Sequence, residues 1–261
     1  MAYGHRNTFF DHIQSDASRA KRYDLAMRAH GSREGFDVVH TVQSYPWAKL
    51  GKATVVDVSP SRPLSILDVQ SNNADFSFKF FFHGNQMGGN QGYVSVALAE
   101  QFPSLSFQVQ DLPGTRSDET VPGPAQVVPG HLADRVKLTT HDFFHEQTVV
   151  ADAYLLRHVL HAFPDKVVVR ILRQLIPALR RGARIIIHDA VLPPPGSVSP
   201  TEERTSRLLD VLMKTVCNGR EREVEDWRAV LERADARFVW HGAWKSSGHL
   251  WFIEAVWQGS W

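Results

Sequence analysis

Apolar side chains recur along this chain with two alternating periods, one typical of strands and one typical of helices. Short apolar runs predict strands at 53–57, 106–111, 136–139, 153–156 and 183–188, with two more ending at 251–257. Apolar positions three and four residues apart predict helices at 8–30, 93–102, 167–179, 201–216 and 224–234. Alternating helices and fully apolar strands indicate a parallel sheet covered by helices on both faces. The sequence therefore predicts a doubly wound α/β fold with a seven-stranded, mostly parallel sheet.

The helix predicted at 167–179 contains one unfavourable residue, Pro177. A proline inside a helix removes a backbone donor and kinks the helix. Gly182 is expected to end this helix, so that the fifth strand begins at Ala183.

Composition and charge exclude several classes of protein. The chain has 261 residues, a formal net charge of +1 and one cysteine, Cys217. It lacks the basic footprint of nucleic-acid binding proteins and the run of roughly 18 apolar residues that spans a bilayer. A lone cysteine excludes a disulfide framework and a cysteine-based metal cluster, and no signal peptide is recognisable. We therefore expect a soluble cytoplasmic protein with no nucleic-acid or membrane partner.

Polar and glycine residues follow several predicted strands, at the edge where doubly wound sheets bind ligands. Asp111, after the second strand, is suited to accept hydrogen bonds from ribose hydroxyls, although a solvated loop acid is an equally good interpretation. The glycine-rich turn at 88–92 lacks the G-x-G-x-x-G spacing, which disfavours a nicotinamide-dependent oxidoreductase. Asp142 and Phe143, after the third strand, offer a carboxylate and an aromatic edge to a base. Taken singly, each of these signals is weak.

Four segments in a fixed order carry a more specific signal. They are Gly-Gly-Asn-Gln-Gly at 88–92, Phe-Gln-Val-Gln-Asp-Leu-Pro at 107–113, Leu-Leu-Arg-His-Val-Leu-His-Ala-Phe-Pro-Asp at 155–165 and Asn-Gly-Arg-Glu-Arg at 218–222. With them the chain resembles the C-terminal catalytic domain of the S-adenosylmethionine-dependent O-methyltransferases of the caffeate/flavonoid type, in their fungal secondary-metabolism branch. The resemblance implies a Rossmann-like class I methyltransferase fold, S-adenosylmethionine as cofactor and a small aromatic, phenolic substrate.

The resemblance also implies which residues bind the two ligands. By it, Gly88 and Gly89 lie against the methionine part of the cofactor, Asp111 holds the ribose hydroxyls, Asp142 and Phe143 meet the adenine, and Arg157 lies beside the cofactor. Met27 and Met213 match family positions that grip a flat aromatic acceptor.

His161 matches the general base of the family, and Asp189 and Glu221 match the two acids that flank its imidazole. A phenol has a pKa near 10 and needs a positioned base at neutral pH, for which histidine is the usual choice. Neighbouring carboxylates favour the imidazolium that forms. The sulfonium donor is already activated, so the resemblance implies no metal. His158 is expected to face elsewhere and to be structural.

One stretch interrupts the cofactor turn. In the family the first strand runs directly into the glycine turn, whereas here residues 58–87 separate Asp57 from Gly88. Deleting 58–86 restores an unbroken Val-Val-Asp-Met-Gly-Gly motif, and splice-site consensus sequences can encode its ends. Our hypothesis is a retained intron translated in frame. The alternative is a genuine surface insertion, because long loops cost little entropy.

Family enzymes carry a helical dimerisation domain before the catalytic domain. We interpret residues 1–50 as a helical linker left from that missing domain, and 51–261 as the methyltransferase domain, interrupted at about 58–86. The family's homodimer is therefore in doubt for this chain. The leading hypothesis is methyl transfer to a phenolic hydroxyl of a secondary metabolite. The alternative is a catalytically impaired remnant or interaction protein that keeps the fold.

Overall fold

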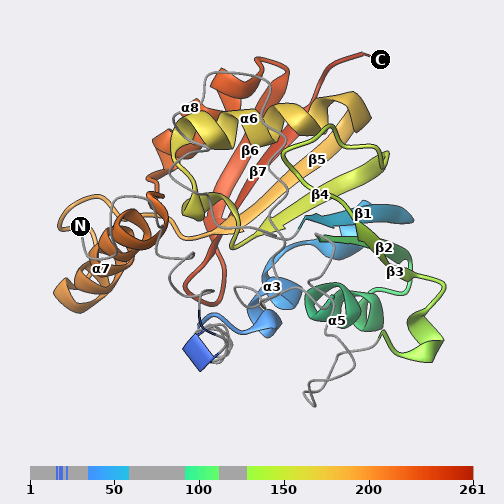
Figure 1. Cartoon of the computed structure of the whole chain (residues 1–261), viewed down its shortest axis with the longest axis horizontal. Coiled ribbons are helices and arrows are strands. Elements are labelled where there is room, and N and C mark those ends of the chain that lie inside the picture. The colour runs from blue at the N-terminus through green and yellow to red at the C-terminus, as the bar shows by residue number, and fades with distance from the viewer. Residues whose placement is uncertain are drawn as a thin grey trace.

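A computed structural model describes residues 16, 18, 19, 22, 35–58, 92–111 and 128–260 (Figure 1). Its strands are β1 (Ala53–Val58), β2 (Leu105–Asp111), β3 (Val136–Thr140), β4 (Ala151–Arg157), β5 (Leu179–Asp189), β6 (Phe238–Lys245) and β7 (Trp251–Trp257). They form one sheet in the order β3-β2-β1-β4-β5-β7-β6. Strands β1 to β5 pair in parallel, and β7 lies antiparallel between β5 and β6. The prediction of a seven-stranded, mostly parallel sheet is confirmed.

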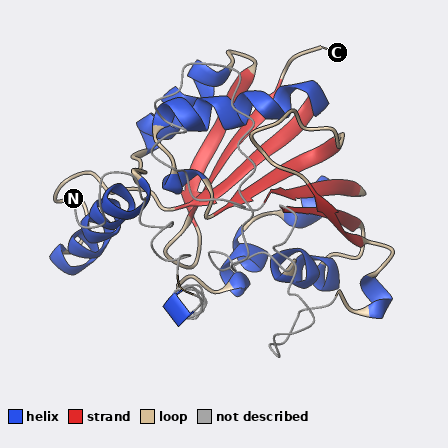
Figure 2. Cartoon of the chain, in the orientation of Figure 1, coloured by secondary structure: helices blue, strands red, loops and turns tan. Residues whose placement is uncertain are grey.

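Helices cover both faces of this sheet. The described helices are α3 (Val38–Ser44), α5 (Tyr93–Gln101), α6 (Asp165–Leu175), α7 (Pro200–Cys217) and α8 (Val224–Ala234), with short 3-10 turns η1 (Trp47–Leu50), η2 (Gly130–Leu132), η3 (Leu160–Ala162) and η4 (Ile176–Ala178). Helices α6 and α8 lie on one face and α3 and α5 on the other, while α7 extends away from the sheet (Figures 1 and 2).

Two hydrophobic cores result, one on each face. Neighbouring strand residues point to opposite faces, so Val56 and Leu156 enter the core with α6 and α8, whereas Val55 and Leu155 enter the core with α5. Trp47, which is fully buried, belongs to the second core. The described part of the segment before β1 therefore packs onto the sheet.

The boundary between α6 and β5 differs from the prediction. Helix α6 ends at Leu175, Pro177 lies in η4, and β5 begins at Leu179. Pro177 has no N–H to continue the helical ladder, which is why the helix ends before it. Gly182 does not end the helix but lies inside β5 with a φ of 89°. There it sits where the pairing of β5 with β4 shifts register.

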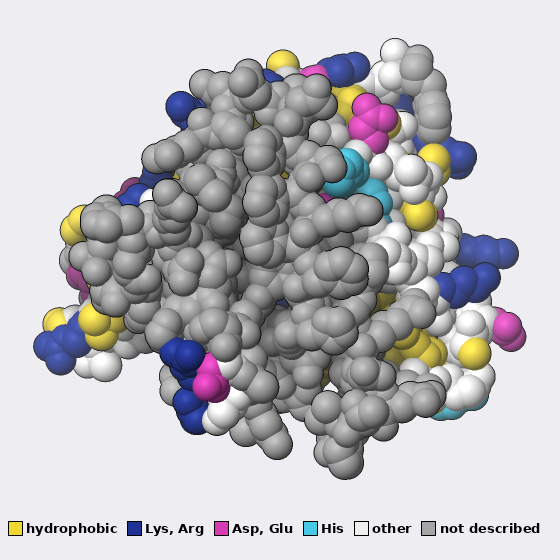
Figure 3. Space-filling view, viewed as in Figure 1, with side chains coloured by type: hydrophobic (Ala, Val, Ile, Leu, Met, Phe, Trp, Pro, Cys, Tyr) yellow, Lys and Arg dark blue, Asp and Glu magenta, His cyan; other side chains and the backbone are white. Residues whose placement is uncertain are grey.

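Charged side chains of both signs lie at the margin of the face drawn in Figure 3. In the space-filling view, Lys and Arg side chains of the described residues alternate with Asp and Glu around the rim of this face (Figure 3). Among the described helices, each is too short or too polar to cross a membrane.

Candidate active site

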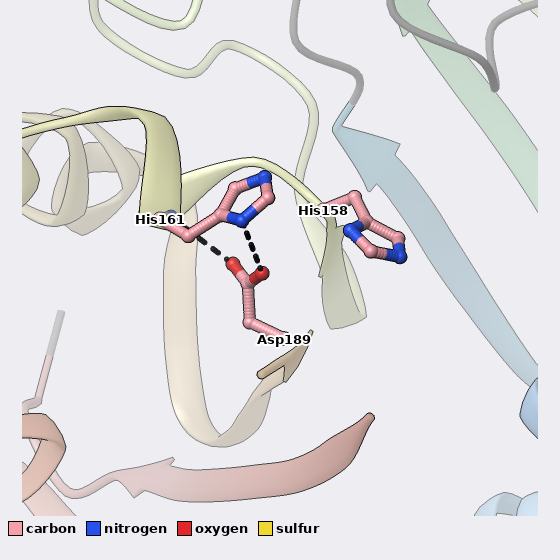
Figure 4. Close-up of side chains that lie close together, drawn as sticks. All are labelled: His158, His161 and Asp189. Carbon is pink, nitrogen blue, oxygen red and sulfur yellow. Dashed lines mark hydrogen bonds and ion pairs between the residues drawn. The ribbon is translucent and has the colours of Figure 1, made fainter. Parts of the chain in front are cut away.

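The candidate site lies beyond the carboxyl ends of β4 and β5. Turn η3, which follows β4, presents His161, and β5 ends at Asp189 (Figure 4). Glu221 follows α7 and places Oε1 3.0 Å from His161 Nδ1. Asp189 Oδ1 lies 3.6 Å from the same nitrogen, and Asp189 Oδ2 accepts the backbone N–H groups of Leu160 and His161. The structure thus brings together the three side chains for which catalytic roles were predicted.

The two carboxylates change the protonation of the histidine. Burial by itself lowers the pKa of His161, but Asp189 and Glu221 outweigh it and raise that pKa to about 9. Burial also raises the pKa of the Asp189 carboxyl. Because Nδ1 faces the carboxylates, it carries the proton in the neutral ring, and Nε2 is left as the acceptor.

The other ring nitrogen of His161, Nε2, is available to bind a ligand. Nε2 is buried and has no hydrogen-bond partner in the described part of the chain. It points away from Asp189 (Figure 4). A buried imidazole with one nitrogen fixed by carboxylates and the other unpartnered is suited to accept a proton from a ligand.

From the sequence, His158 was predicted to face away from this site, but its ring lies beside that of His161. Its ring centroid lies 5.4 Å from that of His161 and 5.6 Å from that of Phe36. His158 has a φ of 54°, a conformation that is uncommon outside glycine. Donor atoms of His158, His161 and Asp189 lie within 4.8 Å of one another and could hold a metal ion. His161 Nδ1, however, is already hydrogen-bonded to Glu221.

Arg157 was predicted to lie beside the cofactor. In the structure its side chain links the end of β4 to α3 and α5 through hydrogen bonds. Its Nε donates to Thr41 Oγ1 at 3.1 Å, and its two terminal nitrogens donate to the Tyr93 hydroxyl and the Phe36 carbonyl. These partners belong to α3, α5 and the segment just before α3. Sequence reasoning missed this network, because a lone threonine in a helix gives no signal of a distant arginine. Thr41 also bonds to the buried His188 at 3.2 Å.

The predicted adenine contacts have different environments. Asp142 follows β3, accepts the N–H of Phe144 through Oδ1 and lies 3.5 Å from His145. The Phe143 side chain is buried and packs against Phe144 and Phe163, with ring centroids 4.8 and 5.8 Å away. Phe143 therefore belongs to the core under η3.

The remaining predicted positions divide into described and undescribed ones. Met213 is buried in α7 as part of the core that also holds Phe163. The backbone of Asp111 pairs with Thr140 at the carboxyl edge of the sheet, but its side chain is outside the described part. Met27, Gly88 and Gly89 lie outside the described residues, as does the stretch 59–86.

Comparisons with known proteins show which family the sequence matches. A model of the O-methyltransferase domain family matches residues 64–237, a range that begins after β1. An O-methyltransferase from the grayanic acid biosynthesis cluster of Cladonia grayi is 40% identical over 259 residues, which are 99% of this chain and 50% of that relative. O-methyltransferase bfoD of Aspergillus brasiliensis is 36% identical over 251 residues, 96% of this chain and 52% of that relative. The chain thus spans about half the length of the curated relatives it matches.

Solved structures show the same fold at lower identity. NcsB1, an O-methyltransferase from neocarzinostatin biosynthesis in complex with S-adenosylmethionine and 2-hydroxy-5-methyl naphthoic acid, matches with a TM-score of 0.66 and 22% identity over 96% of this chain and 61% of that one. Mitomycin 7-O-methyltransferase MmcR matches with a TM-score of 0.68 and 21% identity over the same shares. Since the family model covers more than half of the sequence, the chain belongs to the O-methyltransferase domain family.

Proposed function

We propose that this chain transfers a methyl group from S-adenosylmethionine to a phenolic hydroxyl of a small aromatic secondary metabolite, with His161 as general base. The observation that carries the proposal is the His161 imidazole, whose Nδ1 faces two buried carboxylates while Nε2 has no described partner. The names of the fungal relatives and the ligands of NcsB1 support the donor and the aromatic class of acceptor.

The raised pKa of His161 suits this chemistry. Proton transfer from a phenol with a pKa near 10 to a base with an ordinary histidine pKa near 6.5 is uphill by roughly 3.5 units, or about 5 kcal/mol. With the pKa of His161 at about 9, the mismatch falls to roughly one unit, or about 1.4 kcal/mol. Asp189 and Glu221 stabilise the imidazolium after the proton arrives, while S-adenosylmethionine supplies an activated methyl group.

A donor that carries adenosine and a carboxylate is proposed to bind at the neighbouring strand ends, and the start of α5 supports this. Gly92 begins α5 with a φ of 73°, and a Cβ there would lie 3.3 Å from side chains of Val109 and Leu138. This close approach sets the start of α5 against β2 and β3. An N-terminal helix end favours an anionic group such as a carboxylate.

In the proposal, six residues hold the donor: Gly88, Gly89, Asp111, Asp142, Phe143 and Arg157. Two of them act through their packing. Arg157 ties α3 and α5 to the end of β4, and Phe143 supports η3 from below. Met213 of α7 and Met27, which lies outside the described residues, are proposed to contact the acceptor.

Two measurements on the chain test the proposal. Calorimetric titration with S-adenosylmethionine should give saturable binding, and radiolabelled donor should methylate a hydroxynaphthoic acid used as a model acceptor. The His161→Ala variant should bind the donor with unchanged affinity and lose methylation. Absence of donor binding by the chain would overturn the proposal in favour of a non-enzymatic protein that keeps the fold.

A further inference from the structure

The segment Asn218–Arg222 runs along turn η3, and only one of its side chains, Glu221, has a role so far. Arg222 is 0% exposed, which is unusual for an arginine. Its terminal nitrogens donate to the carbonyls of Leu160 at 3.1 Å and Phe163 at 2.8 Å. These two carbonyls stand on either side of His161 in the chain. The guanidinium therefore holds the turn that presents the histidine.

The charge of Arg222 is compensated chiefly by Asp165, while the Asp189 carboxylate adds a weaker electrostatic attraction. Asp165 Oδ1 accepts hydrogen bonds from Nε at 3.0 Å and from a terminal nitrogen at 2.9 Å. The guanidinium also lies over the Trp227 ring, 4.9 Å from its centroid. Buried charges need such pairing to be tolerated. Glu221 is thereby left to His161.

The backbone of the same segment also contacts the turn. Arg220 donates its N–H to the His161 carbonyl at 3.0 Å. A Cβ on Gly219 would lie 2.2 Å from that carbonyl oxygen, so only glycine permits this approach. Glu221 in turn holds the His161 ring, and its own N–H donates to Asp210 Oδ1 of α7 at 2.9 Å.

We propose that Arg222 is a positioning residue for His161. Its fork fixes the backbone of η3, while the adjacent Glu221 fixes the ring, so one short segment sets both the place and the orientation of the imidazole. This rests on the proposed function only for its catalytic consequence. The geometric part concerns the His161–Glu221 contact, which is measurable without turnover.

An arginine suits this place because its donors reach the Leu160, Arg220 and Phe163 carbonyls and Asp165 Oδ1 at the same time. The guanidinium presents five donors in a rigid fork, whereas a lysine ammonium is a compact point charge that cannot reach the same set. Arg222→Lys keeps the charge and removes the fork. A displacement of about 1 Å at a catalytic group can lower a rate by about a hundredfold.

Arg135 offers a matched control. It also donates to three backbone carbonyls, those of Ala99, Phe102 and Leu105, but these belong to α5, its end and the start of β2. Arg135→Lys therefore removes a similar fork in a different place. An effect that follows from general loss of stability should be shared by the two variants.

The experiment compares the two variants by NMR and by steady-state kinetics. The downfield Nδ1 proton of His161, assigned by its absence from His161→Gln, should move or broaden in Arg222→Lys and stay in place in Arg135→Lys. With the hydroxynaphthoic acid as acceptor, kcat should fall tenfold or more in Arg222→Lys while KM for S-adenosylmethionine stays within twofold. An unchanged resonance and kcat in a folded Arg222→Lys protein would overturn the proposal.

A second variant covers the case in which Arg222→Lys does not fold. Gly219→Ala pushes the segment away from the His161 carbonyl and should move the same resonance, whereas Gly130→Ala, with nothing within 4 Å of the added Cβ, should not. Gly219→Ala without any change would also overturn the proposal. If the unmodified chain transfers no methyl group at all, the proposed function fails, and the NMR comparison still decides the role of Arg222.

Discussion

Arg157 and His161 lie four residues apart at the end of β4 and are buried to nearly the same extent, with 7% and 6% of each residue exposed. Their surroundings differ in one respect. The Arg157 side chain donates from all three of its nitrogens to neighbouring elements, whereas His161 is fixed at Nδ1 and has no partner at Nε2 among the described residues. The comparison separates a side chain whose interactions hold the fold from one that keeps an interaction for a ligand.

The largest expected effect is that of His161→Ala. General bases contribute about a hundred- to ten-thousandfold to rates, so methylation of a phenolic acceptor should fall by about a thousandfold. Donor affinity, measured by calorimetry, should stay within twofold, because His161 is not among the residues proposed to hold the donor. His145→Ala is the control, since this ring lies mostly in solvent. Turnover of His161→Ala within a few-fold of the parent would remove His161 as the base.

Arg157→Met should instead reduce stability. It leaves three buried or partly buried oxygens without their donor, on Phe36, Thr41 and Tyr93. Each unsatisfied group costs about 1–3 kcal/mol, and partial relaxation makes a total loss of about 3 kcal/mol the expected result. Urea denaturation measures it. Arg173→Met, at a more exposed pair of carbonyl contacts between α6 and α8, should cost clearly less.

Glu221→Gln should alter the pH dependence. In the parent, neutral His161 forms only as the pH rises toward about 9, so kcat/KM should climb over that range. Removing a carboxylate that stabilises the imidazolium lowers this pKa, so the acidic limb should move to lower pH. The rate on the alkaline plateau should fall by about tenfold, because a weaker base accepts the proton less readily.

The control for Glu221→Gln is another buried carboxylate. Glu254 of β7 accepts a hydrogen bond from Tyr45 and pairs with Arg184. Glu254→Gln removes a carboxylate of similar burial from a different part of the sheet, so the acidic limb should stay in place. A limb that moved equally in both variants would show that net charge, not the contact with His161, sets the pH dependence.

Most of the fold could be predicted from the sequence, because buried parallel strands and amphipathic helices leave periodic patterns. Helix α8 has the predicted bounds, Val224–Ala234. The prediction was wrong at Gly182, because a glycine at this place can either end a helix or lie inside an irregular strand. A glycine after a helix usually ends it, but the chain had already left the helix at Pro177, and the glycine serves an irregular strand pairing.

Only part of the candidate site could be predicted from the sequence. His161 and Glu221 were found through short motifs and Asp189 through its place after the fifth strand and the family resemblance, and the three side chains meet as expected. His158 was misplaced because its orientation depends on a positive φ, which a histidine in a sequence does not reveal. Thr41 and Arg222 were missed because their partners are distant in the chain or are backbone carbonyls.

The smallest effect is expected from Thr41→Val, which removes one link of the Arg157 network. Thr41 Oγ1 accepts from Arg157 Nε and bonds to His188 Nδ1, so its loss weakens two buried contacts. Arg157 retains two other acceptors, and the free energy of unfolding should fall by about 1 kcal/mol. Thr205→Val, on the exposed face of α7, should change it by less than about 0.5 kcal/mol. If the hydrogen bonds of Arg157 do not affect the protonation of His161, the pH profile of methylation should be the same in both variants. A shifted acidic limb in Thr41→Val would mean that the hydrogen bonds of Arg157 influence the pKa of His161.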